Sequence, residues 1–224
     1  GTYSFTMPSG DVKITATFAE DPDWTEPEEP ATDVSDIFID IAPNAWYKDA
    51  VQYAYDNGLM TGVSDTEFAP EATTTRAMIV SILARLEGVT SAEAAGFADV
   101  DDNDWYATAV NWAASVGVVN GYEDNTFRPN TPITREQMAA ILYNYADYKG
   151  YDVSAGEDTN ILSFDDAFAV SEYAIPAMQW ACGSGMVRGI AQKGGMLLAP
   201  RDTTTRAQAA TLIMRFQSAF AKEP

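Results

Sequence analysis

The sequence predicts a mainly α-helical protein made of three tandem helix-loop-helix units that pack with pseudo-threefold symmetry, preceded by a short β-hairpin and a linker. Three observations support this prediction. The same landmark residues recur in three stretches, each stretch holds two segments with apolar residues at helical spacing, and each second segment opens with Thr-Arg. Because a two-helix unit cannot cover its own apolar stripe, the three units should bury their stripes against one another.

The repeat aligns without gaps between the first two copies. Every landmark moves by 59 positions: Phe38 to Phe97, Trp46 to Trp105, Gly62 to Gly121, Pro70 to Pro129 and Arg76 to Arg135. A third, looser copy keeps the same order as Phe164, Tyr173, Gly189, Pro200 and Arg206. Its glycine-to-proline loop is longer, 11 positions against 8 in the other two copies. We assign copy one to residues 37–92, copy two to 93–155 and copy three to 156–224.

Two N-terminal segments lie outside the repeat. Residues 1–19 alternate around "PSGD" as a β-hairpin would. Residues 20–36 are rich in proline and acids, which is typical of an extended linker.

The first helix of each copy is expected at Trp46–Asn57, Trp105–Val116 and Tyr173–Cys182. Each of these segments is followed by a glycine, at positions 58, 117 and 183, that suits a left-handed helix cap. The second helices should begin after the N-cap residues Thr75, Thr134 and Thr205. Gln137 and Gln208 complete capping boxes in copies two and three, whereas copy one has Met78 at that position.

The arginine of each Thr-Arg pair falls at the first position of a helix, where the macrodipole disfavours a cation by about 0.3–1 kcal/mol. Helix stability therefore does not explain Arg76, Arg135 and Arg206. We expect a negative group opposite each arginine, beside free backbone N–H groups that also favour an anion. The group is either an acidic side chain from a neighbouring unit, in a structural ion pair, or the carboxylate or phosphate of a ligand. Three occurrences favour the ligand.

Composition excludes several classes of function. The chain carries 33 acidic residues against 13 basic ones, a net charge of -20, which disfavours nucleic acid and anionic membranes as partners. It has no run of about 20 apolar residues, so we expect no membrane insertion. There is no histidine, and Cys182 is the one cysteine, so histidine-based triads and cysteine zinc clusters are excluded. The acidic stretch 99–104 lacks the glycine and glutamate of an EF-hand. We expect no catalytic residue, no metal and no cofactor.

The segment "FADVDDNDWYATAVNWAASVGVVNGYEDNTFRPNTPITREQMAAIL" resembles an S-layer homology (SLH) motif, and three such motifs would cover Phe38 to about Phe220. The Thr-Arg-Ala-Glu signature of that family falls on Thr75–Met78, Thr134–Gln137 and Thr205–Gln208, and all three lack the final glutamate. Residues 1–19 resemble the last hairpin of small β repeats in bacterial surface proteins, as a remnant of such a domain.

This resemblance implies a non-catalytic module that anchors an extracellular protein to the bacterial cell surface or S-layer. The module would be a monomer with an internal pseudo-trimer, and its partner a secondary cell wall polysaccharide that often carries pyruvylated N-acetylmannosamine. The carboxylate of the pyruvate ketal would meet the arginines in grooves between adjacent motifs. The alternative is a protein–protein or S-layer assembly module whose repeated arginines are structural ion pairs. An enzyme acting on wall polymers is a third, less favoured, hypothesis.

The resemblance also implies the residues of the ligand site. They are the arginines Arg76, Arg135 and Arg206, the loop glycines Gly62, Gly121 and Gly189 that would admit a sugar, the hydroxyl acceptors Asp65 and Asp124, the exposed Tyr122, and the aromatic residues Trp46 and Trp105. Trp46, Trp105 and Tyr173 either stack on a sugar or, in the favoured interpretation, belong to the core. Copy three has Gln192 and Lys193 where the aspartate is expected, so its groove should be the most degenerate.

Overall fold

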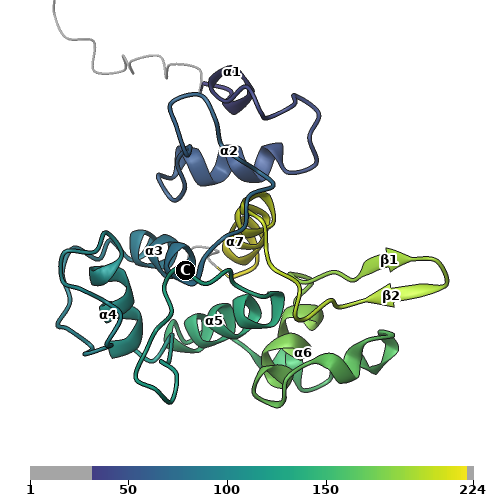
Figure 1. Cartoon of the computed structure of the whole chain (residues 1–224). Helices are drawn as coiled ribbons and strands as arrows, with labels where there is room; N and C mark the ends of the chain where they lie inside the picture. Colours follow the sequence, from purple (N-terminus) through teal and green to yellow (C-terminus); the bar gives the residue numbers. More distant parts are fainter. Residues whose placement is uncertain (1–31, 221–224) are drawn as a thin grey trace, which may run out of the picture. The chain divides into compact units, whose positions relative to one another are not determined.

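A computed structural model describes residues 32–220 and shows a mainly α-helical fold (Figure 1), which confirms the predicted fold class. The predicted hairpin at 1–19 and most of the predicted linker lie outside the described residues. The end of that linker is not extended. Asp33 accepts a hydrogen bond from the backbone N–H of Ser35 at 2.9 Å and begins a short helix whose Val34 is fully buried. The compact unit that contains the three copies begins at Thr32.

The helices follow the three copies. Copy one, with the short helix before it, contains α1 (Val34–Ile37), α2 (Lys48–Asp56) and α3 (Arg76–Leu86); copy two contains α4 (Ala107–Ser115) and α5 (Arg135–Tyr148). Copy three contains α6 (Ile175–Gly183), α7 (Arg206–Phe220) and a two-stranded antiparallel sheet of β1 (Ile190–Gln192) and β2 (Gly195–Leu197). Four 3-10 turns lie between α5 and α6: η1 (Ser154–Gly156), η2 (Ile161–Ser163), η3 (Ala167–Ala169) and η4 (Glu172–Ala174). The sheet occupies the longer glycine-to-proline loop of copy three.

The first helix of each copy begins two residues later than predicted. Trp46, Trp105 and Tyr173 therefore lie in the turns before α2, α4 and α6. Gly58 and Gly117 have positive φ angles of 65° and 76°, as expected for left-handed caps. The third prediction was wrong, because Gly183 stays within α6 and Gly185 has the positive φ angle of 73°. A side chain on Gly183 would meet the carbonyl oxygen of Ala155, so close packing explains that glycine instead.

The three copies exchange helix partners in a closed cycle. The second helix of each copy packs on the first helix of the next, in the pairs α3 with α4, α5 with α6, and α7 with α2 (Figure 1). The predicted apolar stripes fill this interface, and Ile79, Leu83, Met138, Leu142, Ile213 and Phe216 are almost fully buried. Pseudo-threefold packing therefore gives each helix the partner that its own copy does not supply.

A three-membered ring of backbone hydrogen bonds lies among the segments that lead into α3, α5 and α7. Thr74 N–H donates to the Thr204 carbonyl at 2.8 Å, Thr204 to Ile133 at 2.9 Å, and Ile133 to Thr74 at 2.9 Å. All three residues are fully buried. Each copy thus contributes one donor and one acceptor, so that no copy can leave without breaking two of the three bonds.

The N-terminal amides of the second helices are not free, which corrects the expectation from the sequence. The N–H groups of Arg76 and Ala77 donate to carbonyls of copy two, at Thr131 and Pro129. Four equivalent bonds run from the first two amides of α5 to Asp202 and Pro200, and from those of α7 to Ala72 and Pro70. The third amide is capped by threonine, with full capping boxes at Thr134 and Thr205 and a single bond at Thr75. These amides hold the copies together and leave no vacant anion site.

Close packing at the loop glycine Gly62 gives a stability prediction. A side chain on Gly62 would lie 2.6 Å from Cε1 of Phe38 and 2.8 Å from the carbonyl oxygen of Glu67. Gly62→Ala should therefore lower the free energy of unfolding by about 1–3 kcal/mol, measured by urea denaturation. Gly58→Asn is the matched control, because nothing lies within 4 Å of a Cβ added there and asparagine tolerates a positive φ angle. Equal stability of the Gly62 variant and the control would contradict this packing.

The buried ring of hydrogen bonds gives a second prediction. The Oγ1 atom of Thr204 is buried and makes no hydrogen bond within the described residues, and copy two already has an isoleucine at this position. Thr204→Val should raise the free energy of unfolding by about 1 kcal/mol, because it removes an unsatisfied hydroxyl. In the control Thr211→Val the lost hydroxyl donates to the Ala207 carbonyl at 2.8 Å, so stability should not rise. The two denaturation midpoints provide the check.

Candidate functional site

Each arginine at the start of a second helix reaches into the loop of the next copy. In all three cases Nε donates to one backbone carbonyl of that loop and Nη2 to another. The pairs are Arg76 with Phe127 (2.9 Å) and Asn120 (3.4 Å), Arg135 with Leu198 (2.8 Å) and Arg188 (3.3 Å), and Arg206 with Phe68 (2.8 Å) and Thr61 (2.6 Å). The arginines therefore join the copies, but their acceptors are carbonyls rather than carboxylates.

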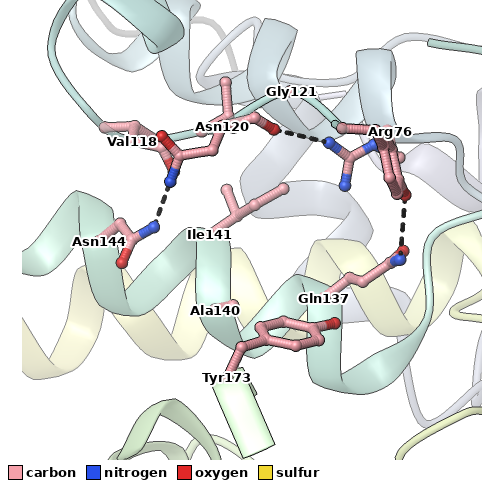
Figure 2. Close-up of a pocket in the computed structure, with 11 residues that line it drawn as sticks. Arg76, Val118, Asn120, Gly121, Gln137, Ala140, Ile141, Asn144 and Tyr173 are labelled. Atoms are coloured by element: carbon pink, nitrogen blue, oxygen red, sulfur yellow. Dashed lines mark hydrogen bonds between the residues drawn. The ribbon is translucent and has the colours of Figure 1, made fainter. Parts of the chain in front are cut away.

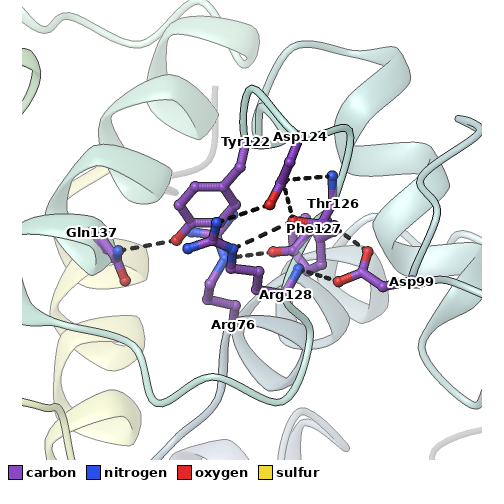
Figure 3. Close-up of polar contacts among 8 residues, drawn as sticks. All are labelled: Arg76, Asp99, Tyr122, Asp124, Thr126, Phe127, Arg128 and Gln137. Carbon is purple, nitrogen blue, oxygen red and sulfur yellow. Dashed lines mark hydrogen bonds and ion pairs between the residues drawn. The ribbon is translucent and has the colours of Figure 1, made fainter.

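A carboxylate lies one peptide group behind the carbonyl that each Nε contacts. Asp40 accepts hydrogen bonds from the N–H groups of Phe68 and Ala69, at 2.9 and 2.6 Å. The peptide between Phe68 and Ala69 therefore donates to Asp40 and accepts from Arg206. Asp99 makes the equivalent bonds in the loop that meets Arg76 (Figure 3). Asp166 makes them in the loop that meets Arg135. The expected negative group exists, but it acts through a polarised peptide.

This arrangement requires an unusual backbone. The residue after the bridging carbonyl has a positive φ angle in each copy although none of the three is glycine: 56° at Ala69, 58° at Arg128 and 49° at Ala199. Such a conformation costs about 1–2 kcal/mol for a residue with a side chain. The cost is offset because it turns the N–H toward the aspartate and the preceding carbonyl toward the guanidinium.

The three guanidinium groups are enclosed but not ion-paired. Arg76 and Arg206 are 7% and 8% exposed, and burial lowers the pKa of all three arginines from the usual value without removing their charge. Within residues 32–220, the ion pairs are Lys48–Asp33, Arg128–Asp124 and Lys149–Glu87. None of them involves these arginines, so the interpretation of direct structural ion pairs was wrong. The Nη1 groups of Arg76, Arg135 and Arg206 donate no hydrogen bond to any described residue.

Each arginine lines one pocket, and each pocket takes residues from all three copies. We name them after the arginine: the Arg76 pocket has a volume of about 380 Å³, the Arg135 pocket about 280 Å³ and the Arg206 pocket about 400 Å³. The Arg76 pocket combines that arginine from copy one, residues 118–122 and α5 from copy two, and Tyr173 from copy three (Figure 2). The grooves are therefore not confined to two adjacent copies, as the sequence suggested. Their sizes are near the lower end of the range for small-molecule sites.

The aromatic residues before the first helices are exposed, so the interpretation of these as core residues was wrong. Trp46, Trp105 and Tyr173 are 65%, 62% and 60% exposed, and line the Arg135, Arg206 and Arg76 pockets respectively. In copies one and two the tyrosine that follows the tryptophan is the N-cap residue of α2 or α4, and it is more buried than the tryptophan. The tryptophan packs edge-to-face on it, with ring centroids 5.3 and 5.2 Å apart.

The loop glycines line the pockets, but a protein ring fills the space that a side chain would need. Gly62, Gly121 and Gly189 line the Arg206, Arg76 and Arg135 pockets. The first phenylalanine landmark of the same copy, at positions 38, 97 and 164, lies against each of them. Each glycine therefore allows a phenylalanine of its own copy to pack directly against the loop backbone.

Tyr122 is part of a pocket, whereas the loop aspartates are not. Tyr122 lines the Arg76 pocket, where its hydroxyl accepts a bond from Gln137 at 3.4 Å. The guanidinium carbons of Arg76 and Arg128 lie 5.1 and 3.9 Å from its ring centroid (Figure 3). Asp124 pairs with Arg128 at 3.1 Å outside the pocket. Asp65 is exposed and lines none of the three pockets.

Sequence reasoning missed a second set of polar residues on the second helices. Arg85, Asn144 and Arg215 line the Arg206, Arg76 and Arg135 pockets, and each donates to a carbonyl of its own copy, at Leu59, Val118 and Met186. Each lies nine positions after the arginine of its own copy, so the spacing could have revealed them. With Arg188, which lines the Arg135 pocket, six of the eight arginines of the chain line these three pockets.

One further residue and one property of the helices bear on function. Cys182 is half-buried, and burial raises the pKa of its thiol to about 11, so the thiol is protonated at neutral pH. Among the described helices, none has the length and apolar character needed to cross a membrane.

Comparison with known proteins matches residues 38–77 and 96–139 to the model of the S-layer homology domain. An amylopullulanase of Thermoanaerobacterium thermosulfurigenes is 33% identical over 79% of this chain, but only 9% of that protein is covered. The surface-layer 125 kDa protein of Lysinibacillus sphaericus is 26% identical over 77% of the chain and 14% of its own length. A cellulosome-anchoring protein of Acetivibrio thermocellus is 27% identical over 66% of the chain and 33% of its own length.

The chain thus spans a third or less of the length of each of these relatives, which differ in name but share this segment. The family model matches copies one and two, and copy three repeats their helices, their threonine cap and their arginine contacts. The chain therefore belongs to the S-layer homology family.

Proposed function

We propose that this chain is a non-catalytic module that holds a larger protein on the outside of a bacterial cell, by binding an anionic cell wall polysaccharide in its three pockets. One observation carries the proposal. In a chain with a net charge of -20, six of eight arginines line three equivalent pockets, and within residues 32–220 none of the six forms an ion pair. Grouping cations in this way is unfavourable unless an anion binds among them.

The relatives support an attachment role. An amylopullulanase, a surface-layer protein and a cellulosome-anchoring protein share this segment over a minor part of their lengths. Two of these names refer to a surface layer or to anchoring and the third to a polysaccharide-degrading enzyme, and the shared part cannot account for such different names. A common means of attachment, made of motifs at 37–92, 93–155 and 156–224, accounts for it. The activity of the protein that this chain belongs to would then reside elsewhere.

The pockets suit a pyruvylated sugar such as N-acetylmannosamine with a pyruvate ketal. The ketal carboxylate would accept hydrogen bonds from the Nη1 groups of Arg76, Arg135 and Arg206, which have no described partner. The sugar ring would lie against the exposed Trp46, Trp105 or Tyr173. The loops at Gly62, Gly121 and Gly189 would form the floor, and Tyr122 would add a contact in the Arg76 pocket. Asp65 and Asp124 lie outside the pockets and have no role in this proposal.

The alternative is a protein–protein or S-layer assembly module in which the arginines only join the copies. The carbonyl contacts of the arginines agree with part of that hypothesis. It does not account for the exposed aromatic ring beside each arginine, or for Arg188, which lines the Arg135 pocket and whose side chain makes no hydrogen bond to a described residue. A ligand site accounts for both.

A test of the ligand site must change the pockets without loosening the fold. Trp46 and Trp105 are suitable because both are largely exposed. The double variant Trp46→Ala, Trp105→Ala should bind pyruvylated N-acetylmannosamine about 3- to 10-fold more weakly at two of the three pockets, measured by calorimetry. Its melting temperature should stay unchanged.

Phe168→Ala is the matched control, because this aromatic side chain is 93% exposed and lines none of the three pockets. Unchanged ligand binding by the double tryptophan variant, with intact retention on isolated wall polymer, would refute the proposed site. It would favour the assembly module.

The arginines of the Thr-Arg pairs should be needed for both fold and binding. Arg206→Ala removes two charge-assisted hydrogen bonds from a buried position and should lower the free energy of unfolding by about 1.5–3 kcal/mol, measured by urea denaturation. Arg201→Ala, at an exposed position outside the three pockets, should have little effect. An Arg206 variant as stable as the Arg201 variant would show that the carbonyl contacts do not stabilise the fold.

A further inference from the structure

The three pockets share a plan but differ in charge. The Arg135 pocket contains three arginines: Arg135, Arg188 and Arg215. The Arg206 pocket contains two, Arg206 and Arg85. The Arg76 pocket contains only Arg76, because Asn144 takes the place that Arg85 and Arg215 have in the other copies.

The cations of the Arg135 pocket are not balanced by carboxylates in contact with them. Burial lowers the pKa of the Arg215 guanidinium, and the positive charge of the nearby Arg188 lowers it further. Asp202 and Asp166 act on Arg135 from a distance, and the two oxygens of Asp166 already accept the N–H groups of Leu198 and Ala199. Among the described residues, no carboxylate forms an ion pair with these arginines. The pocket therefore has an excess of positive charge when it is empty.

The Arg76 pocket differs in the opposite direction. Its aromatic wall, Tyr173, has a buried carboxylate behind it, because Glu136 is only 5% exposed and lies 3.5 Å from the Tyr173 hydroxyl. Glu136 accepts hydrogen bonds from the N–H and the hydroxyl of Ser171, at 2.9 and 2.8 Å. The other two copies have alanine at this position, Ala77 and Ala207. Near the Arg76 pocket, the second cation Arg128 is already paired with Asp124, whereas the Arg135 pocket is lined by three arginines without an ion pair to a described residue.

We propose that the Arg135 pocket binds a phosphate monoester on a sugar, a group with about two negative charges, in preference to a singly charged carboxylate. A phosphate monoester carries a charge of about -1.5 to -2 at pH 7 and three strong acceptor oxygens. Planar guanidinium groups match those oxygens in pairs, so three arginines suit phosphate better than they suit one carboxylate. This inference rests on the proposed function, in which the pockets receive anionic groups of a wall polymer.

The tryptophans allow two of the three pockets to be observed separately. The indole N–H of Trp46 reports on the Arg135 pocket and that of Trp105 on the Arg206 pocket, while the fully buried Trp180 lines none of the three pockets and serves as a reference. The ¹⁵N-labelled chain would be titrated with mannose 6-phosphate and, in parallel, with glucuronate as a singly charged sugar. We expect the Trp46 signal to saturate at a concentration of mannose 6-phosphate at least about tenfold lower than of glucuronate, with a smaller difference at Trp105.

Arg188→Gln should abolish most of this preference at Trp46 and leave the Trp105 response unchanged. This residue is exposed, and its side chain makes no hydrogen bond to the described residues, so the fold should survive the change. Arg201→Gln is the control for a charge lost outside the pockets. Similar affinities for the two ligands at Trp46, a preference that persists in Arg188→Gln, or no response of Trp46 to millimolar mannose 6-phosphate would each overturn the proposal.

The outcomes separate this inference from the proposed function. A chain that binds wall polymer but shows no preference for phosphate at Trp46 loses only the inference. A chain that prefers phosphate at Trp46 but is not retained by wall polymer keeps the inference about the pocket and loses the anchoring function.

Discussion

The contact on which the structure depends is the hydrogen bond from an arginine at a helix start to a loop carbonyl of the next copy, backed by an aspartate one peptide away. It occurs three times, as Arg76, Arg135 and Arg206 with the loops that Asp99, Asp166 and Asp40 hold. Direct pairing of two buried charges would require both to lose their water. With a peptide between them, each charge has its own partner, and the loop is fixed at the same time.

The same contact determines what the pockets can do. The guanidinium is held by Nε and Nη2, so its orientation is set before any ligand arrives, and the ordering cost of binding is reduced. Because each pocket is lined by residues of all three copies, a ligand that enters it contacts all three copies. Binding should therefore stabilise the folded chain as well as attach it, since any ligand that binds only the folded state shifts the folding equilibrium.

Much of the fold could be read from the sequence, because landmark spacing, apolar periodicity and threonine caps are local signals. The arginine was also predicted, since a cation at a helix N-terminus needs an explanation beyond the helix. The sequence did not show that its partner is a carbonyl, because contacts between copies depend on backbone direction. The exposure of Trp46 and Trp105 was missed because a two-residue shift in helix start changes the face on which a side chain lies. Asp65 and Asp124 were chosen for closeness to a glycine along the chain, which does not fix where a side chain points. The Phe-x-Asp pattern at Asp40, Asp99 and Asp166 was a better signal, because these aspartates hold the loops that the arginines contact.

The pairing of α7 with α2 affects the order in which the structure can form. Among the described helices, α2 is synthesised before α3 to α6, yet its partner α7 is synthesised after them, more than 140 residues later. Contacts this distant along the chain form slowly, because a long loop must close first. The apolar face of α2 therefore remains uncovered throughout synthesis of the intervening copies. Only a chain with all three copies can close the cycle, so a protein truncated within the third copy would present unprotected hydrophobic surface and become a target for quality-control proteases.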